Sequence, residues 1–124
     1  ARIIPIDKDH RPDAWKPWLG DSVAHWDGDV LVVETRNLHP QQAPRNIAAL
    51  SDSGVVVERF SRFSDEQVLY EFEVRDPIFY TEAWSGEMAF NATDTKPYEY
   101  ACHEGNYGLP GILAGARRLE MDEQ

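Results

Sequence analysis

Residues 22–37, SVAHWDGDVLVVETRN, carry the strongest fold signal in this sequence of 124 residues. Asp27 and Gly28 divide two runs that are rich in β-branched and aromatic residues. An Asp-Gly pair between two such runs is typical of a tight hairpin turn, because both central positions of that turn need a positive φ angle. The stretch therefore predicts a β-hairpin with strands at residues 21–26 and 29–36.

A second hairpin is indicated by the alternation of apolar and polar residues in residues 55–75. Runs at 55–63 and 68–75 flank a polar tip at 64–67. Successive side chains of a strand point to opposite faces, so the alternation predicts an apolar face and a solvent face. The apolar face takes Val57, Phe63, Val68, Tyr70, Phe72 and Val74, and the solvent face takes Glu58, Arg62, Glu71 and Glu73.

Further strands are expected at residues 2–6, 82–91 and 98–103, which gives about seven strands in total. A long connection at 38–54 is expected to hold one helical turn at 46–50. Near the C-terminus, a proline is followed by helix formers, and apolar residues recur at helical spacing at Ile112, Leu113, Ala116 and Leu119.

These elements predict a mainly β protein with one domain over residues 1–124. The simplest architecture is an antiparallel meander that rolls into a half-open or closed barrel. The C-terminal helix is expected to close one end of the barrel or to cover a strand edge.

Composition excludes several function classes. The chain has 22 acidic and 12 basic residues, and the basic ones are scattered, so nucleic acid is a poor partner. No apolar run approaches the roughly 20 residues that span a bilayer. One cysteine forms no internal disulfide, and the four histidines lack the spacing of a metal-binding pair, so we expect neither a metal nor a cofactor.

Three separated motifs occur in order along the chain: GDSVAHWDGDVLVVETRN at 20–37, VVERFSRFSDEQVLYEFEVRDPIFYTEAWSGEM at 56–88 and YEYACHEGNYGLPGILAGAR at 98–117. Together they resemble a family of exported bacterial proteins of unknown function, common in soil and environmental genomes. The resemblance implies a periplasmic or secreted location and is compatible with a fragment that lacks upstream strands. It implies no catalytic residues.

The first hairpin supplies one candidate site. With Asp27-Gly28 as the turn, Asp21 faces Glu34 across the ladder, and both share a face with His25, whereas Trp26 lies on the other face. Two opposed carboxylates push one pKa upward unless a cation intervenes, which is how acid/base pairs are tuned. The alternative is a frayed strand end in which Asp21 pairs with Arg36 or with water.

Arg59 is the second candidate, because it falls on the otherwise apolar face of the second hairpin, opposite Phe72. A guanidinium there needs a carboxylate or a ligand anion, and Glu34 and Glu87 are the nearest candidates. The alternative is a structural salt bridge, or an arginine at the barrel end that reaches water.

In YACHEGNYGLPG, residues 100–111, the only cysteine stands beside a histidine and a glutamate. In a strand, Cys102 and His103 point to opposite faces, so they do not form a nucleophile–base pair. Cys102 is then a small buried hydrophobe, and His103 remains a candidate base at the rim of a turn.

We therefore expect a small exported β-barrel that binds an apolar or aromatic small molecule in its mouth. Its acid/base chemistry, if it is an enzyme, would use Glu34 or His103 as base and Arg59 to hold a developing anion. The alternative is an interaction module that pairs with a partner chain, or with a second copy, through a strand edge. The residues expected to meet the ligand are Asp21, His25, Trp26, Tyr70 and Trp84.

Overall fold

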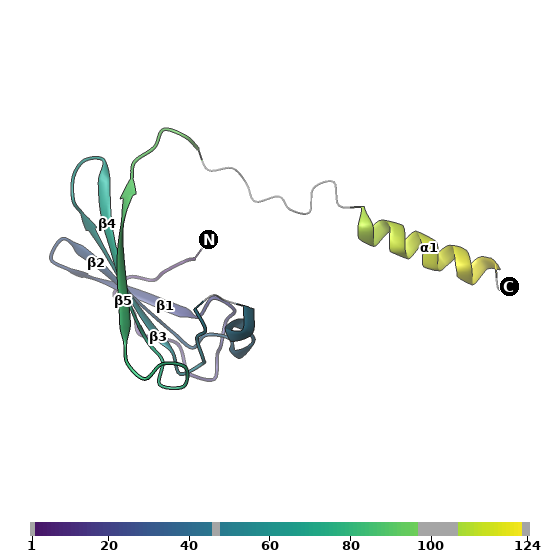
Figure 1. Ribbon diagram of the computed structural model, residues 1–124, viewed down its shortest axis with the longest axis horizontal. Coiled ribbons are helices and arrows are strands. Elements are labelled where there is room, and N and C mark those ends of the chain that lie inside the picture. Colours follow the sequence, from purple (N-terminus) through teal and green to yellow (C-terminus); the bar gives the residue numbers. More distant parts are fainter. Residues whose placement is uncertain (1, 46–47, 97–106, 123–124) are drawn as a thin grey trace. The chain divides into compact units, whose positions relative to one another are not determined.

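The computed structural model describes residues 2–45, 48–96 and 107–122. They belong to two compact units, Ala1–Ala92 and Thr93–Gln124. In the described residues, the first unit contains a five-stranded sheet and the second contains one α-helix (Figure 1).

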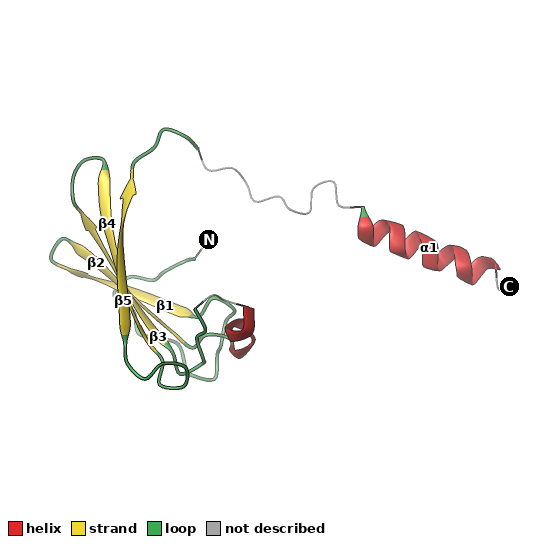
Figure 2. Cartoon of the chain, viewed as in Figure 1, coloured by secondary structure: helices red, strands yellow, loops and turns green. Residues whose placement is uncertain are grey.

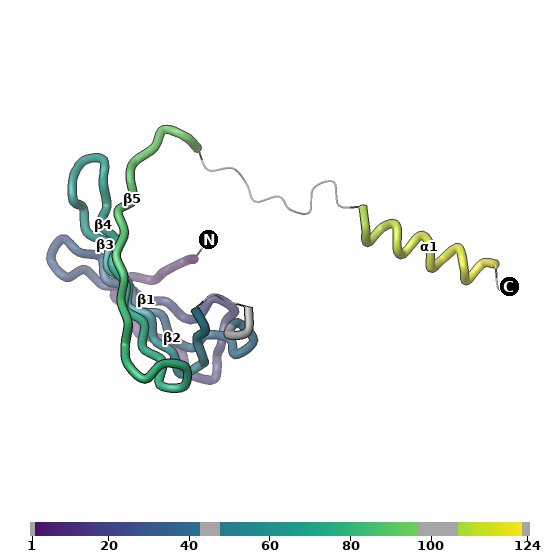
Figure 3. Tube along the Cα trace, in the orientation of Figure 1, coloured from purple at the N-terminus to yellow at the C-terminus, as the bar shows by residue number. Residues whose placement is uncertain are grey.

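The sheet is an antiparallel meander in which each strand pairs with the next one along the chain (Figure 2). Figure 3 follows the backbone through the five strands. Their bounds are β1 (Asp21–Asp27), β2 (Val30–Arg36), β3 (Val55–Arg62), β4 (Gln67–Arg75) and β5 (Trp84–Asn91).

The sheet is not closed into a barrel. A barrel needs hydrogen bonds between its first and last strands, with consistent tilt and stagger, and β1 and β5 make no contact with each other. Residues 2–6, predicted as a strand, contribute only an isolated parallel bridge between Ile6 and Ala24. Residues 98–103, predicted as another strand, lie outside the described residues. The prediction of a closed barrel is therefore wrong, whereas the antiparallel meander is confirmed.

The first hairpin forms, but its turn differs from the predicted one. Asp27 pairs with Val30, so Gly28 and Asp29 are the central residues of the turn. Gly28 takes a φ of 60°, as expected for glycine at the first central position of a hairpin turn. The pairing is displaced by two residues, and Asp21 consequently lies opposite Arg36 instead of Glu34. A displacement by an even number leaves every side chain on its predicted face.

In the second hairpin, the pairing of β3 with β4 is displaced by one residue from the predicted register, and this reverses the predicted faces of β3. Arg62 pairs with Val68, which makes the connecting loop one residue longer than predicted. As a result, Glu58 lies opposite Phe72 on the apolar face, and Arg59 lies opposite Glu71 on the charged face. The predictions that Glu58 faces solvent and that Arg59 faces the apolar side are wrong, because a one-residue slip turns every side chain over.

The apolar face of β3, β4 and β5 carries a group of contacting rings, which we call the aromatic strip. Tyr70 lies at its centre, with ring centroids 4.9 Å from Phe60, 5.7 Å from Phe72 and 5.2 Å from Phe90. Trp84 meets Phe72 edge to face at 5.6 Å. These separations are typical of favourable aromatic pairs, so the strip stabilises the fold by more than the burial of its apolar area alone.

Two loops are joined by Asp76, which is 3% exposed. Its carboxylate accepts hydrogen bonds from the Ser51 backbone N–H at 2.5 Å and from the Ser51 hydroxyl at 3.0 Å. It also accepts one from the Ile78 N–H at 2.9 Å. The long connection between β2 and β3 is thereby tied to the loop that follows β4. That connection contains a 3-10 helix at Pro40–Arg45, and the predicted turn at 46–50 begins outside the described residues.

The second unit contains α1 (Gly108–Asp122), which confirms the predicted C-terminal helix. The described residues of this helix are all exposed. Its predicted role in closing or covering the sheet stays a prediction.

Gly86 is predicted to be intolerant of a side chain. A Cβ atom there would lie 2.6 Å from a ring carbon of Phe72, so Gly86→Ala displaces a ring at the centre of the aromatic strip. We expect this substitution to lower the free energy of unfolding by about 1–3 kcal/mol, measured by urea denaturation. Ser85→Ala, at the neighbouring position on the opposite face, is the control and is expected to change stability by less than about 0.5 kcal/mol. Equal stability of the two variants would contradict this packing.

Candidate functional site

A cluster that we call the His10 clasp joins the N-terminal segment to the first hairpin. The Nδ1 atom of His10 lies 2.9 Å from Asp21 Oδ2, and its Nε2 atom lies 3.1 Å from Glu34 Oε1. An ionised carboxylate only accepts hydrogen bonds, so the imidazole donates to both partners only when each ring nitrogen carries a proton. The group that lies between the two carboxylates is therefore a histidine that lies well before the hairpin in the sequence.

The clasp keeps Asp21 ionised. Burial alone would raise the pKa of Asp21, but hydrogen bonds from the Arg11 backbone N–H at 2.9 Å and from His10 outweigh burial and lower that pKa. Glu34 is also paired, with Arg36 Nε at 2.5 Å. Because both carboxylates and both ring nitrogens have partners, the clasp holds the chain together and offers no free base.

The opposite face holds a second buried charge, on Glu58. This carboxylate is 6% exposed and forms an ion pair with Arg2, with nitrogen–oxygen distances of 2.9 and 2.8 Å. The hydroxyl of Tyr70 donates to the same carboxylate at 3.0 Å. Burial, together with the negative charge of Glu58, raises the pKa of Tyr70 to about 12. Tyr70 is therefore a fixed hydrogen-bond donor and remains protonated at neutral pH.

The candidate residues from the sequence lie on both faces of the sheet. Asp21, His25, Glu34 and Arg59 share one face, and Trp26, Tyr70 and Trp84 share the other. Arg59 is 47% exposed and lies 3.8 Å from Asp27, and it does not reach Glu34. The sheet thus separates the ionisable candidates from the aromatic ones. The remaining candidate, His103, lies outside the described residues.

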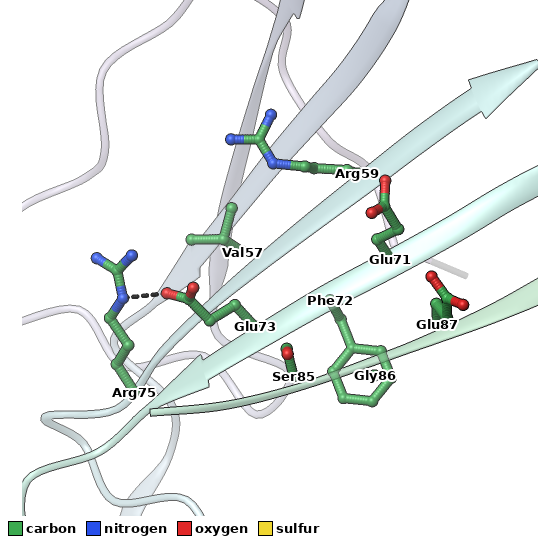
Figure 4. Close-up of a pocket in the computed structure, with 9 residues that line it drawn as sticks. All are labelled: Val57, Arg59, Glu71, Phe72, Glu73, Arg75, Ser85, Gly86 and Glu87. Carbon is green, nitrogen blue, oxygen red and sulfur yellow. Dashed lines mark hydrogen bonds and ion pairs between the residues drawn. The ribbon is translucent and has the colours of Figure 1, made fainter. Parts of the chain in front are cut away.

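One surface depression, which we call the charged hollow, lies along β3, β4 and β5 (Figure 4). Its volume is about 420 Å³. Arg59, Glu71 and Glu87 form a row across the three strands, one residue from each strand. In the neighbouring row, Glu73 is paired with Arg75. The full lining is Val57, Arg59, Glu71, Phe72, Glu73, Arg75, Ser85, Gly86 and Glu87.

Two carboxylates of the hollow lack partners. No hydrogen bond or ion pair joins Glu71 or Glu87 to another residue in the described ranges, although the two lie directly opposite each other on β4 and β5. Like charges in directly opposed positions destabilise a sheet, so an added cation would be favourable here. Sequence reasoning placed Glu71 on the solvent face and named Glu87 only as a partner for Arg59. It did not bring Arg59 opposite Glu71, because its register for β3 was displaced by one residue.

Within the described part of the chain, the outer edge of β5 presents unpaired backbone groups. The Ala92 N–H donates to the Glu66 carbonyl at 2.7 Å, which continues the β4–β5 register. Hydrogen-bonded and non-hydrogen-bonded positions alternate along an antiparallel ladder. Met88 and Phe90 therefore bond to β4, while the N–H and C=O groups of Ser85, Glu87, Ala89 and Asn91 point outward.

The β1 edge is different, because the N-terminal segment covers part of it. The Ala24 N–H donates to the Pro5 carbonyl at 2.9 Å, and the Asp7 N–H donates to the Ala24 carbonyl at 2.8 Å. Among the described residues, no backbone hydrogen bond of this kind protects the outer edge of β5.

The comparisons with protein-family models, curated proteins and solved structures found no match to this chain. Within the described ranges, no helix is both long and apolar enough to cross a membrane. In the same residues, no three histidine, cysteine, aspartate or glutamate side chains are grouped so that they could hold a metal ion.

The sheet is predicted to lose stability in acid through two carboxyl groups. Asp21 and Asp76 both have lowered pKa values, because hydrogen bonds to their ionised forms outweigh burial. A carboxyl group whose pKa is lowered by folding stabilises the folded state. This stabilisation is complete above the pKa of the unfolded state, about 3.9, and is lost as the pH falls through the pKa of the folded state. We expect the free energy of unfolding, measured with urea from pH 7 to pH 3, to fall as the pH drops below about 4.

Asp21→Asn is expected to be less stable than the wild type at pH 7 and to show a smaller loss in acid. The matched control is Asp29→Asn, which removes an exposed turn carboxylate and should keep the wild-type pH profile. An unchanged acid slope in Asp21→Asn would refute the role of the clasp.

Proposed function

We propose that this protein is a polypeptide-binding module that accepts a strand of another chain at the outer edge of β5. The observation that carries the proposal is the row of outward backbone groups on β5. Such a row is a template for strand addition, in which main-chain hydrogen bonds supply affinity and alternate side chains supply specificity.

Three features of the edge support this function. β5 is eight residues long and contains no proline, so its ladder is not interrupted. Only Glu87 among its residues is charged, whereas protected edges commonly carry several charges. Met88 and Phe90 are 48% and 46% exposed, so an added strand would cover apolar area that the sheet leaves in water.

Acid/base catalysis is not part of this proposal. Of the groups expected from the sequence, Glu34 is held by His10 and Arg36, and Arg59 lies 3.8 Å from Asp27, so each already has a partner within the chain. From the family resemblance, the proposal also includes that the protein is exported to the periplasm or beyond.

The edge is testable by hydrogen exchange in the free protein. We expect the amides of Glu87 and Ala89 to exchange rapidly and those of Met88 and Phe90 to exchange slowly, because only the latter pair bonds to β4. The measurement is residue-resolved exchange by NMR at a concentration where the protein is monomeric. Slow exchange at all four amides would mean that the edge is already covered, and the proposal would fail.

Binding is testable with an array of synthetic eight-residue peptides that favour extended structure. Ala89→Pro removes an outward N–H and leaves the β4–β5 hydrogen bonds in place, so it should abolish capture of any peptide that the wild type binds. Ala89→Ser keeps the N–H and serves as the matched control. Peptides that bind equally to all three proteins would exclude the β5 edge as their site.

A second candidate function is small-molecule binding. The sequence predicted it in the mouth of a barrel, and the charged hollow is where the open sheet offers space for it. The hollow favours this candidate through its volume of about 420 Å³ and through two carboxylates that have no partner in the described ranges, but it points to a cationic ligand instead of an apolar one. Titration with 1,4-diaminobutane should shift the NMR signals of Glu71 and Glu87 in the wild type. The affinity for 1,4-diaminobutane obtained from this titration should be at least about twofold weaker in Glu87→Gln. An absence of shifts in the wild type would exclude this candidate.

A further inference from the structure

We propose that the strand added to β5 alternates apolar or aromatic residues with lysine or arginine, and that a basic side chain of this strand occupies the charged hollow. This inference rests on the proposed function, because it names the chemistry of the partner at the same edge.

A strand added to β5 would extend both faces of the sheet at once. Side chains directly opposed on neighbouring strands have Cβ atoms about 5 Å apart, so each partner residue faces a residue of β5 on the same side. One set of alternate partner residues would therefore lie beside Met88 and Phe90, and the other set would lie beside Glu87 and Ala89. The two sets meet different chemistry.

The first set meets the aromatic strip. Tyr70 on β4 lies between Phe60 on β3 and Met88 on β5, so this row of apolar side chains ends at the open edge. Phe90 stacks on Tyr70 with an interplanar angle of 21° and is 46% exposed. Apolar or aromatic partner residues would continue these rows and remove the exposed area from water.

The second set meets the row formed by Arg59, Glu71 and Glu87. The charges along it run positive, negative, negative toward the open edge. Glu71 and Glu87 have no partners among the described residues, and Arg59 contacts Asp27 instead. A cation in the next position would neutralise the adjacent carboxylates, and the net charge of −10 would also draw a basic strand toward the protein.

A second copy of the same strand fits this edge less well. β5 has the sequence WSGEMAFN, which contains no lysine or arginine. Pairing of two β5 strands would therefore bring a second glutamate to the hollow without a cation, at a cost from like charges. The charges favour a different chain as the partner.

The test uses the full chain and three synthetic eight-residue peptides. All three carry the same apolar residues at alternate positions, and the intervening positions are lysine, serine or glutamate. We expect the lysine peptide to bind at least about tenfold more tightly than the glutamate peptide in fluorescence anisotropy at low salt, with the serine peptide between them.

The substitution Glu87→Gln measures how much the charged hollow contributes to binding of the lysine peptide. This variant should weaken binding of the lysine peptide about threefold and leave binding of the serine peptide unchanged. Glu82→Gln, which makes the same change in net charge at an exposed position outside β5, is the matched control and should bind both peptides like the wild type. Circular dichroism would check that the variants remain folded.

The outcomes separate the two proposals. Equal binding of the three peptides, abolished by Ala89→Pro, would overturn the basic partner while supporting the edge function. Binding of none of them, or binding unaffected by Ala89→Pro, would overturn both. A dimer in sedimentation with protected Glu87 and Ala89 amides would identify a second copy as the occupant and would also overturn the basic partner.

Discussion

The antiparallel ladder between β3 and β4 sets the chemistry of both faces of the sheet. Pairing of Arg59 with Glu71 places a positive and a negative charge side by side on one face, and this row continues to Glu87 on β5. Pairing of Glu58 with Phe72 places a carboxylate among aromatic rings on the other face. A slip of one residue would exchange these environments, so the register of a single hairpin determines where the hollow and the aromatic strip lie.

The position of Glu58 in turn explains how the N-terminal segment is held. A carboxylate that is buried without a partner is strongly unfavourable, and Arg2 supplies the cation that Glu58 needs. On the other face, the His10 ring lies between Asp21 and Glu34, within hydrogen-bond distance of both. The segment before β1 is thus attached to one face by the Arg2–Glu58 ion pair and to the other by hydrogen bonds of His10, and its backbone protects part of the β1 edge.

The two edges of the sheet therefore have different properties. The β1 edge is covered in part by residues from the same chain, whereas the described residues leave the outer groups of β5 unpaired. The two faces beside β5 differ, with apolar rings on one and, on the other, carboxylates that have no partners among the described residues. An open sheet can use this asymmetry for strand addition, which a closed barrel cannot, because closure removes its edges.

The sequence by itself determined the five strands of the sheet, both hairpins, the C-terminal helix and the side chains that share each face of β1 and β2, because alternation and turn chemistry are local. Tertiary structure alone decided the register of β3 on β4, since a loop longer by one residue leaves no clear local signal but reverses a face. It also decided the partners of Asp21 and Glu34, because His10 approaches them through space from outside the hairpin. Closure of the sheet was also decided by tertiary structure, because it depends on whether the first and last strands pair. Alternation along one strand carries no information about this pairing.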